Sequence, residues 1–493
     1  MAKKKKSVQL KPAPVKADPS TAQYETSPTL ETQKIGNLLS TPVGMGALLI
    51  GVPLLVRLLH FLFMLPNPLF RTVVMMDASW YHQQALAIVS GDFAPPDGFF
   101  RPPFYSFFLA FVYMVFKPTM NIMMVRLFQC CLGSLNCYLT FRLGERLFSR
   151  RVAWIGWIIM AFYGPLFFFD NELLSPVWEV FFNLVLLLSL TFAEGNTSMK
   201  WWALAGFCLG MSSITRANIL PFLPVMVVWL VWRTKRWLAF EEWRRPALVA
   251  VVLALLPGVL VGVRNKVGYG QFIFIAHQGG LTFHVSNNPQ ADGLSPILPG
   301  RPDFTQSDAT RIVADETKNP APSPGQVAEY FSRKATTFIK ENPGRFLMLT
   351  LKRSYYFLFS SFEGANNIDF DSYAKDSVPK MLFFWRLGRF YFPSGLVIPL
   401  MWCGLAMSLP RWRRLSILYL YLFLQFASFV FFFVVARFRL PSVPIWTLFA
   451  GQALTAQIGN RNMTQTQFKV FAAALVLLVL LVNADPWGAS VRS

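Results

Sequence analysis

Residues 246–263 read PALVAVVLALLPGVLVGV, eighteen positions without a charged side chain. A helix of about 20 apolar residues crosses a bilayer, because every backbone N–H and C=O must be satisfied within the helix in hydrocarbon. Comparable apolar runs occur at 44–64, 121–141, 152–169, 174–192, 201–215, 217–232, 385–406, 415–434, 442–458 and 468–483. The sequence therefore predicts an all-α polytopic integral membrane protein with about 11 transmembrane helices, within a range of 10–13.

The composition supports this class and argues against a soluble or nucleic-acid-binding protein. Of the 493 residues 54% are apolar and 14% are charged, which is too little charge to cover soluble domains. The net charge of +21 comes from short basic clusters between apolar runs rather than from one patch. No nucleic-acid recognition module accompanies them. The cysteines, at 130, 131, 137, 208 and 403, all lie in apolar runs and are expected to pack as small core side chains.

The basic clusters also predict the topology. They lie at 142–151, 233–245, 411–414 and 461–469, and eleven spans place all four on the side of Lys3–Lys6. Loops on the cytoplasmic side carry an excess of Lys and Arg. Two further apolar stretches, 102–117 and 345–361, are predicted to be interfacial helices. Counting the first of them as a span would move the 142–151 cluster to the outside.

This topology defines the domain organisation. Residues 1–43 form a disordered basic cytoplasmic tail, and residues 485–493 form a short C-terminal tail. The transmembrane domain occupies residues 44–484 and includes two extracytoplasmic loops, 65–120 and 264–384. The N-terminus is expected in the cytoplasm and any site in these loops on the extracytoplasmic face.

The first of these loops contains a group of acidic, aromatic and basic residues. Asp77 is followed by Trp80, Tyr81 and His82, then by Gly91-Asp92 and by Arg101-Pro-Pro-Phe-Tyr105. A short helix is predicted over 79–90, with Gly91 ending it. These residues suit an active site at the membrane surface. An aromatic interface belt with incidental charges is the alternative, since Trp and Tyr favour that region in any case.

A second acidic group, Asp170-Asn171-Glu172, lies between two predicted spans. Two carboxylates among phenylalanines and leucines are costly at that depth, which favours a function. The alternative is that they mark the turn between two helices. The predicted topology places them on the same face as Asp77.

Arginines occur at outer helix ends, against the usual distribution of charge. These are Arg216, Arg437 and Arg439. A guanidinium is a natural bidentate partner for phosphate, whereas the alternative is simple snorkelling from a helix end. Together with the carboxylates, they suit transfer of a sugar from a lipid phosphate: the acceptor hydroxyl needs a base and the departing phosphate needs positive charge.

Several motifs carry a family resemblance. Asp77-Ala-Ser-Trp-Tyr-His, Gly91-Asp92 and Arg101-Pro-Pro-Phe-Tyr resemble the first extracytoplasmic loop of GT-C membrane glycosyltransferases. They are most similar to bacterial members of glycosyltransferase family 39, relatives of protein O-mannosyltransferases and lipid A aminoarabinose transferases. The stretches 163–175, 280–289 and 436–441 are also similar to those members. Many relatives have an acidic residue where this chain has Ala78, and Lys where it has Arg101.

The resemblance implies an inverting transferase that uses a polyprenyl-phosphate sugar, with Asp77 matching the catalytic aspartate. Asp77 is predicted to be the general base, and Glu172 and Asp170 are predicted to orient the acceptor or Asp77. The predicted phosphate-binding residues are Arg101, Arg216, Arg437 and Arg439, and the predicted substrate contacts are Trp80, Tyr81, His82, Tyr105, Asn287 and Asn288. The loop around Asn287, Asn288 and Asp292 is expected to act as a lid.

No metal site is predicted, because His82, His277 and His284 lack a metal-ligand spacing. The resemblance implies a polyprenyl-phosphate sugar donor and a lipid, glycan or protein acceptor, in a bacterial inner membrane. A transporter or flippase of lipid-linked sugars is the alternative function. That class predicts charged residues near mid-membrane along an alternating path.

Overall fold

The computed structural model describes residues 41–71, 76–92, 100–116, 121–194, 198–234, 240–301, 304–362, 373–459 and 464–488. The predicted cytoplasmic tail, except for its last three positions, and the last five residues of the C-terminal tail lie outside these ranges. Internal contacts divide the chain into Met1–Leu48 and Leu49–Ser493. Of the first unit only residues 41–48 are described, and they hold the beginning of helix α2.

Helices make up 78% of the described chain, which confirms the predicted all-α class. The helices up to residue 234 are α2 (Pro42–Met64), α3 (Pro68–Arg71), α4 (Met76–Val89), α5 (Phe104–Val115), α6 (Asn121–Leu147), α7 (Arg150–Ala161), α8 (Gly164–Asp170), α9 (Pro176–Ala193), α10 (Met199–Thr215), η2 (Ala217–Ile219) and α11 (Phe222–Thr234). Those that follow are α12 (Phe240–Tyr269), α13 (Gly279–Ser286), α14 (Gln306–Thr317), α15 (Pro324–Glu341), α16 (Pro343–Leu358), α18 (Val378–Phe383), α19 (Ser394–Ser408), η3 (Leu409–Arg411), α20 (Trp412–Phe429), α21 (Ala436–Arg439), η4 (Leu440–Ser442), α22 (Val443–Gly459) and α23 (Gln465–Val482).

Five helices in the described ranges are long and apolar enough to cross a bilayer: α2, α6, α9, the 241–268 part of α12, and α23. The pair α7 and α8 passes the same test as one span that bends by 57° at its break. Several other predicted spans are helical but shorter, such as α10 with 17 residues and α19 with 15. The count of eleven spans therefore stays a prediction.

The predicted span 385–406 differs from the structure at its beginning. Strands β1 (Trp385–Leu387) and β2 (Phe390–Phe392) form an antiparallel hairpin there, and the helix starts only at Ser394. Gly388 at φ +58° occupies the first position of the two-residue loop, where a tight hairpin requires a positive φ. The rings of Trp385 and Phe392 stack across the strands at 5.1 Å. Aromatic residues are as compatible with a strand as with an apolar span. The span was therefore predicted to begin at residue 385, too early in the chain.

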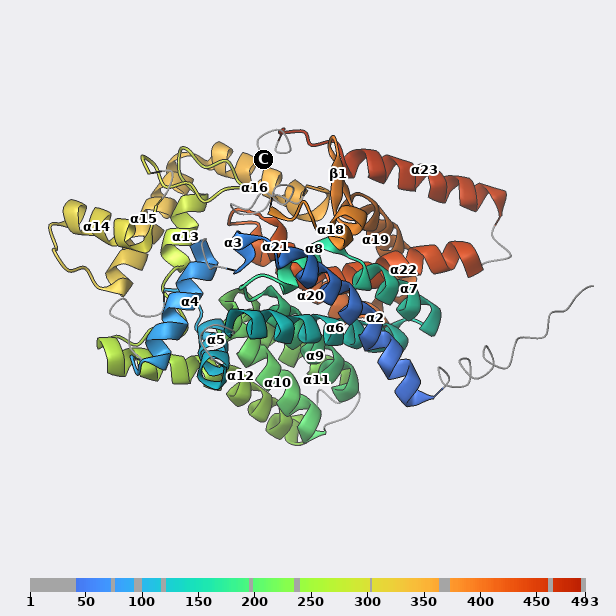
Figure 1. The fold of residues 1–493 in the computed structure, drawn as a ribbon, viewed down its shortest axis with the longest axis horizontal. Helices are drawn as coiled ribbons and strands as arrows, with labels where there is room; N and C mark the ends of the chain where they lie inside the picture. Colours follow the sequence, from blue (N-terminus) through green and yellow to red (C-terminus); the bar gives the residue numbers. More distant parts are fainter. Residues whose placement is uncertain are drawn as a thin grey trace, which may run out of the picture. The chain divides into compact units, whose positions relative to one another are not determined.

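The helices of the bundle approach one another closely where small residues face a neighbour. A Cβ added at Gly206 of α10 would lie 2.2 Å from the carbonyl oxygen of Ala250 in α12. Small residues allow such contacts between helices in membranes, where packing replaces the hydrophobic driving force. Helices α10 and α12 lie side by side as a result (Figure 1).

The segment 264–384 shares its core with the end of the helical bundle. Leu281 and Val285 of α13, Phe331 of α15 and Phe357 of α16 form a buried cluster with Phe438 of α21 and with the end of α20. Helices α13, α15 and α16 are therefore packed directly against the segment that carries Arg437 and Arg439. This packing brings residues from the two predicted extracytoplasmic loops and from α21 to one place.

Candidate functional site

Helix α4 presents Asp77 in its first turn. The helix extends from Met76 to Val89, and Gly91 at φ +89° follows it with its N–H donating to the carbonyl of Ile88. This agrees with the short helix predicted over 79–90 and with Gly91 as its end. A carboxylate in the first turn of a helix is favoured by the free N–H groups of that turn.

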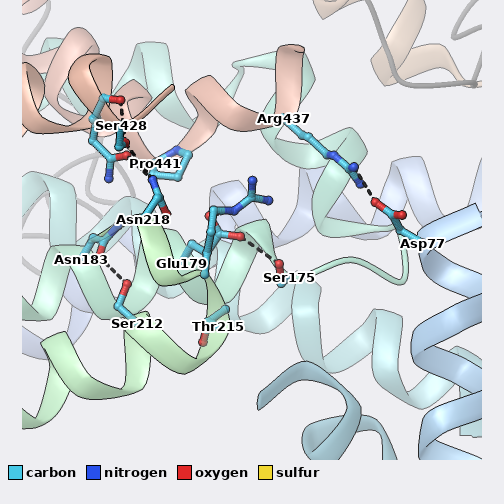
Figure 2. Close-up of polar contacts among 12 residues, drawn as sticks. Asp77, Ser175, Glu179, Asn183, Ser212, Thr215, Asn218, Ser428, Arg437 and Pro441 are labelled. Carbon is cyan, nitrogen blue, oxygen red and sulfur yellow. Dashed lines mark hydrogen bonds and ion pairs between the residues drawn. The ribbon is translucent and has the colours of Figure 1, made fainter. Parts of the chain in front are cut away.

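Two arginines from distant parts of the chain hold the Asp77 carboxylate. Arg101 Nη2 lies 2.5 Å from Oδ1, and Arg437 Nη2 lies 2.5 Å from Oδ2. Figure 2 shows the side chain of Arg437 extending from α21 toward Asp77, to which it donates a hydrogen bond. Each oxygen of the carboxylate therefore has its own guanidinium partner.

The charges around Asp77 determine its protonation. Burial opposes ionisation of the carboxyl, but the positive charges of Arg101, Arg437 and Arg216 outweigh burial. Together they hold the pKa of Asp77 well below its usual range. Asp77 is therefore ionised at neutral pH and carries a fixed negative charge among three cations.

Asp77 and these three arginines line one cavity of about 200 Å³, which we call the Asp77 cavity. Other residues that line it are Tyr81, Pro102, Leu174, Ser175, Pro176, Thr215, Ala217, Asn218, Gln278, Gly279, Thr282, Ser428, Phe429, Phe432, Phe433 and Phe438. The lining thus combines three cations and one carboxylate with polar and aromatic residues. Three of the four arginines predicted to bind phosphate lie here together.

Arg216 reaches this cavity while paired with a residue that the sequence analysis did not single out. Its Nε lies 2.9 Å from Oε2 of Glu179, and Ser175 donates a hydrogen bond to Oε1 at 2.8 Å, as Figure 2 shows for the serine. The Glu179 side chain is only 3% exposed. The sequence feature that could have identified Glu179 is the presence of a carboxylate inside the apolar run 174–192. Charged side chains within spans usually have a partner and a function.

A buried hydrogen-bond network holds the segment that carries Arg437. The Tyr421 hydroxyl donates to the carbonyl of Pro441 at 2.9 Å and accepts from Asn183 and Gln425, each at 3.0 Å. Ser212 donates to Asn183 at 2.7 Å, which links α10 to the same network (Figure 2). Since Pro441 follows α21 directly, these bonds position the arginines of that short helix.

Asp170 and Glu172 lie outside the residues that line the Asp77 cavity. Asp170 is buried and accepts a hydrogen bond from Arg57 Nε at 2.7 Å. Glu172 accepts a hydrogen bond from the hydroxyl of Tyr373 at 3.0 Å. Burial raises the pKa of Glu172 to about 7, although the charge of Arg126 acts in the opposite direction. The structure thus places these two carboxylates with partners of their own.

The aromatic residues and the histidine that were predicted to contact substrate lie partly in the cavity lining and partly outside it. Tyr81 lines the cavity, and its ring packs edge-on against Tyr105 at 5.0 Å. The Tyr105 hydroxyl donates to Gln129 at 2.6 Å, and the ring of Trp80 lies 5.9 Å from the Arg101 guanidinium. His82 bonds through Nδ1 to the Tyr113 hydroxyl at 2.8 Å. Of these four residues, Tyr81 is the one that lines the cavity.

Arg439 and the two asparagines bind backbone groups. Arg439 is buried and donates to the carbonyls of Tyr356, Ser360 and Phe362. Asn287 donates to the carbonyls of Phe283 and Phe431 and accepts from Arg353, and Asn288 donates to those of His284 and Ile297. These contacts hold together the segment 264–384, which was predicted to be extracytoplasmic, near the site. None of the three residues lines the Asp77 cavity.

Within the described ranges, no group of three or more His, Cys, Asp or Glu side chains is arranged to hold a metal ion. The carboxylate of Asp77 has arginine partners instead. A divalent ion at this position would face strong repulsion from these guanidinium groups. The chemistry that the cavity supports directly is that of a carboxylate and cations acting on an anionic ligand.

Among solved structures, the Archaeoglobus fulgidus oligosaccharyltransferase tethered to an acceptor peptide is similar at 12% identity with a TM-score of 0.44, covering 89% of this chain and 55% of that one. The same enzyme with an inhibitory peptide and a dolichol-phosphate is similar at 14% identity, with a TM-score of 0.45, and covers 89% and 55%. ArnT from Cupriavidus metallidurans bound to undecaprenyl phosphate is similar at 16% identity, with a TM-score of 0.37, and covers 86% and 82%.

This chain therefore spans about half the length of the archaeal enzyme that it matches. No curated protein matches it in sequence. Residues 100–261 match the model of the dolichyl-phosphate-mannose-protein mannosyltransferase family. Over these residues the chain is similar to that family, which agrees with the resemblance predicted from the sequence.

Proposed function

We propose that this protein is a membrane glycosyltransferase that moves a sugar from a polyprenyl-phosphate donor to an acceptor hydroxyl on the extracytoplasmic face. The observation that carries the proposal is the Asp77 cavity, in which one carboxylate lies among Arg101, Arg216 and Arg437. The family match over residues 100–261 and the dolichol-phosphate and undecaprenyl-phosphate bound to structurally similar proteins support the choice of donor.

Each charged group has a role in this reaction. Asp77 accepts the proton of the acceptor hydroxyl as its oxygen attacks the anomeric carbon from the face opposite the phosphate, which inverts the configuration there. The bond between that carbon and the phosphate oxygen breaks, and polyprenyl phosphate leaves with the electron pair. The guanidinium groups of Arg101, Arg216 and Arg437 stabilise the negative charge that develops on this leaving group.

The pairing of Asp77 with two arginines makes its basicity depend on the donor. Arg101 and Arg437 lower the pKa of this carboxyl, and a carboxylate of low pKa is a weak base. A phosphate that binds the same guanidinium groups draws them away from Asp77. The pKa of Asp77 then rises toward its ordinary range, so that the base becomes effective when the donor is in place.

The test uses the purified full-length protein in lipid nanodiscs with a panel of polyprenyl-phosphate sugars, in the presence of lipid, glycan and peptide acceptors that supply hydroxyl groups. Mass spectrometry measures release of free polyprenyl phosphate and transfer of the sugar. The wild type is expected to release it, and Asp77→Asn is expected to lose at least about 10²-fold in rate, the usual scale for a missing general base. Asp315→Asn, an exposed carboxylate on α14, is the matched control.

The alternative, a flippase of lipid-linked sugars, predicts a different product. A flippase moves the donor across the bilayer and leaves its sugar–phosphate bond intact. Movement of intact donor across the bilayer of proteoliposomes that contain the protein, without release of polyprenyl phosphate, would refute the transferase proposal. An Asp77→Asn variant with near-full turnover would refute the role of Asp77.

A further inference from the structure

A second cavity, of about 730 Å³, lies among the outer helices α13, α14 and α15. We call it the outer cavity. His284, Arg301, Glu316, Tyr330, Lys334 and Thr337 are among the residues that line it. It has no lining residue in common with the Asp77 cavity.

Helix α13 forms a wall of both cavities. Gly279 and Thr282, three positions apart, line the Asp77 cavity, whereas His284 lines the outer cavity. Residues three apart share a helix face, and a residue two positions further on lies on the opposite side. Helix α13 lies beside α15 (Figure 1), and a Cβ added at Gly280 would lie 1.9 Å from the carbonyl oxygen of Ala328. This close packing holds His284 at the outer cavity.

His284 lines the outer cavity with a ring that is mostly buried. The residue is 7% exposed, its ring lies 5.4 Å from that of Phe331, and its Nδ1 has no hydrogen-bond partner among the described residues. Burial lowers the pKa of His284 to about 4, so the ring is neutral at pH 7 and has one donor and one acceptor nitrogen.

The cations that line the outer cavity are compensated in pairs. Arg301 lies 2.9 Å from Asp308, Lys334 lies 2.9 Å from Glu316, and Arg333 lies 3.5 Å from Glu329. Each of these cations thus has a carboxylate partner of its own, whereas Arg101 and Arg437 share the single carboxylate of Asp77. Paired charges attract an anion weakly, but their free N–H groups and oxygen atoms can bind hydroxyl groups.

Aromatic side chains complete the lining with apolar surface. Tyr330, Phe331 and Phe338 belong to α15 and line the cavity next to these polar groups. A ligand that presents C–H groups on one side and hydroxyl groups on the other fits such a surface. The volume lies within the range of about 300–1,000 Å³ that is typical of small-molecule sites.

We propose that the outer cavity binds a neutral, hydroxyl-rich oligosaccharide. If the proposed transferase function holds, this oligosaccharide is part of the acceptor. The outer cavity and the Asp77 cavity share α13 as a wall, so an acceptor bound in the first lies next to the second. Binding to the outer cavity does not itself require the donor or Asp77. The two proposals can therefore be tested separately.

Saturation-transfer NMR on the full-length protein in lipid nanodiscs tests this site without sugar-based detergents. The probes are maltotetraose and chitotetraose as neutral oligosaccharides, tetragalacturonate as an acidic one, an unglycosylated peptide, and inorganic phosphate. The neutral oligosaccharides are expected to bind the wild type. His284→Phe, which keeps an aromatic ring, and Thr337→Trp, which fills the cavity from an exposed position, are each expected to weaken binding at least tenfold.

The control is Thr336→Ala, an exposed residue of α15 that does not line the outer cavity, and its binding is expected to match the wild type. Failure of both neutral oligosaccharides to bind, binding of only the acidic sugar, the peptide or phosphate, or unchanged binding in both variants would overturn the proposal. Asp77→Asn is expected to keep oligosaccharide binding. A wild type that binds the oligosaccharide but releases no polyprenyl phosphate supports the outer site and refutes the transferase function.

Discussion

Arg437 Nη2 lies 2.5 Å from Asp77 Oδ2, a contact between residues that are 360 positions apart in the chain. It closes the Asp77 cavity by joining α21 to the first turn of α4. Arg101 binds the other oxygen of the same carboxylate. The pair therefore depends on the packing of segments from the two ends of the transmembrane domain.

Replacement of Arg437 by lysine is expected to weaken binding of polyprenyl phosphate about 10- to 100-fold. Charge-assisted hydrogen bonds contribute about 1.5–3 kcal/mol, and an ammonium cannot reproduce the planar fork of a guanidinium. The measurement is the dissociation constant of polyprenyl phosphate in nanodiscs. Arg413→Lys, at the start of α20, serves as the control with unchanged affinity. Equal affinity of both variants and the wild type would exclude Arg437 from phosphate binding.

Replacement of Glu179 by glutamine is expected to lower the stability of the protein strongly. The carboxylate is 3% exposed and pairs with Arg216, and loss of one partner of a buried pair costs about 3–5 kcal/mol. Thermal unfolding in nanodiscs measures the effect as a lower Tm. Glu241→Gln removes an exposed carboxylate that pairs with Arg244 on the helix surface and should leave Tm unchanged. Matching Tm values for the two variants would contradict a structural role for Glu179.

The raised pKa of Glu172 predicts a dependence of stability on pH. Burial raises this pKa from 4.5 to about 7, so the folded state binds more protons than the unfolded state between these values. Stability therefore falls as the pH rises from about 4.5 to 7, by on the order of 3 kcal/mol, and levels off above. The difference in Tm between the wild type and Glu172→Gln, followed from pH 4.5 to 8, isolates this contribution. A difference that does not change with pH would show that Glu172 titrates at its ordinary pKa.

Replacement of Gly133 by alanine is expected to disrupt the pair between Arg57 and Asp170. A Cβ at this position would lie 2.1 Å from Asp170 Oδ2 and 2.6 Å from Arg57 Nε, so the two side chains must move apart. The expected result is a lower Tm with reduced yield of folded protein. Gly51→Ala on α2, where a Cβ meets nothing within 4 Å, is the control with unchanged Tm. Equal Tm values would mean that the pair adapts at little cost.

The sequence was sufficient to predict the helical membrane class, the helix that begins near Asp77, and three of the cationic residues of the cavity. These predictions depend on local properties: apolar run length, the positive φ available to Gly91, and arginines at helix ends. The hairpin at 385–392 was missed because its aromatic residues resemble part of a span by hydropathy. Glu179 was missed because a single carboxylate in an apolar run has no visible partner in the sequence.

The roles of similar residues were decided by tertiary packing. Arg437 and Arg439 are two positions apart on one short helix, yet Arg437 binds the Asp77 carboxylate and Arg439 donates to three backbone carbonyls. Asp77 is paired with two arginines, whereas Asp170 is paired with Arg57 and lies outside the cavity. Apolar runs and basic clusters by themselves determined that the chain is a helical membrane protein, because burial of backbone in hydrocarbon admits few other solutions. The sharing of carboxylates among arginines depends on contacts between segments hundreds of residues apart, and only the folded chain brings those charges within hydrogen-bond distance.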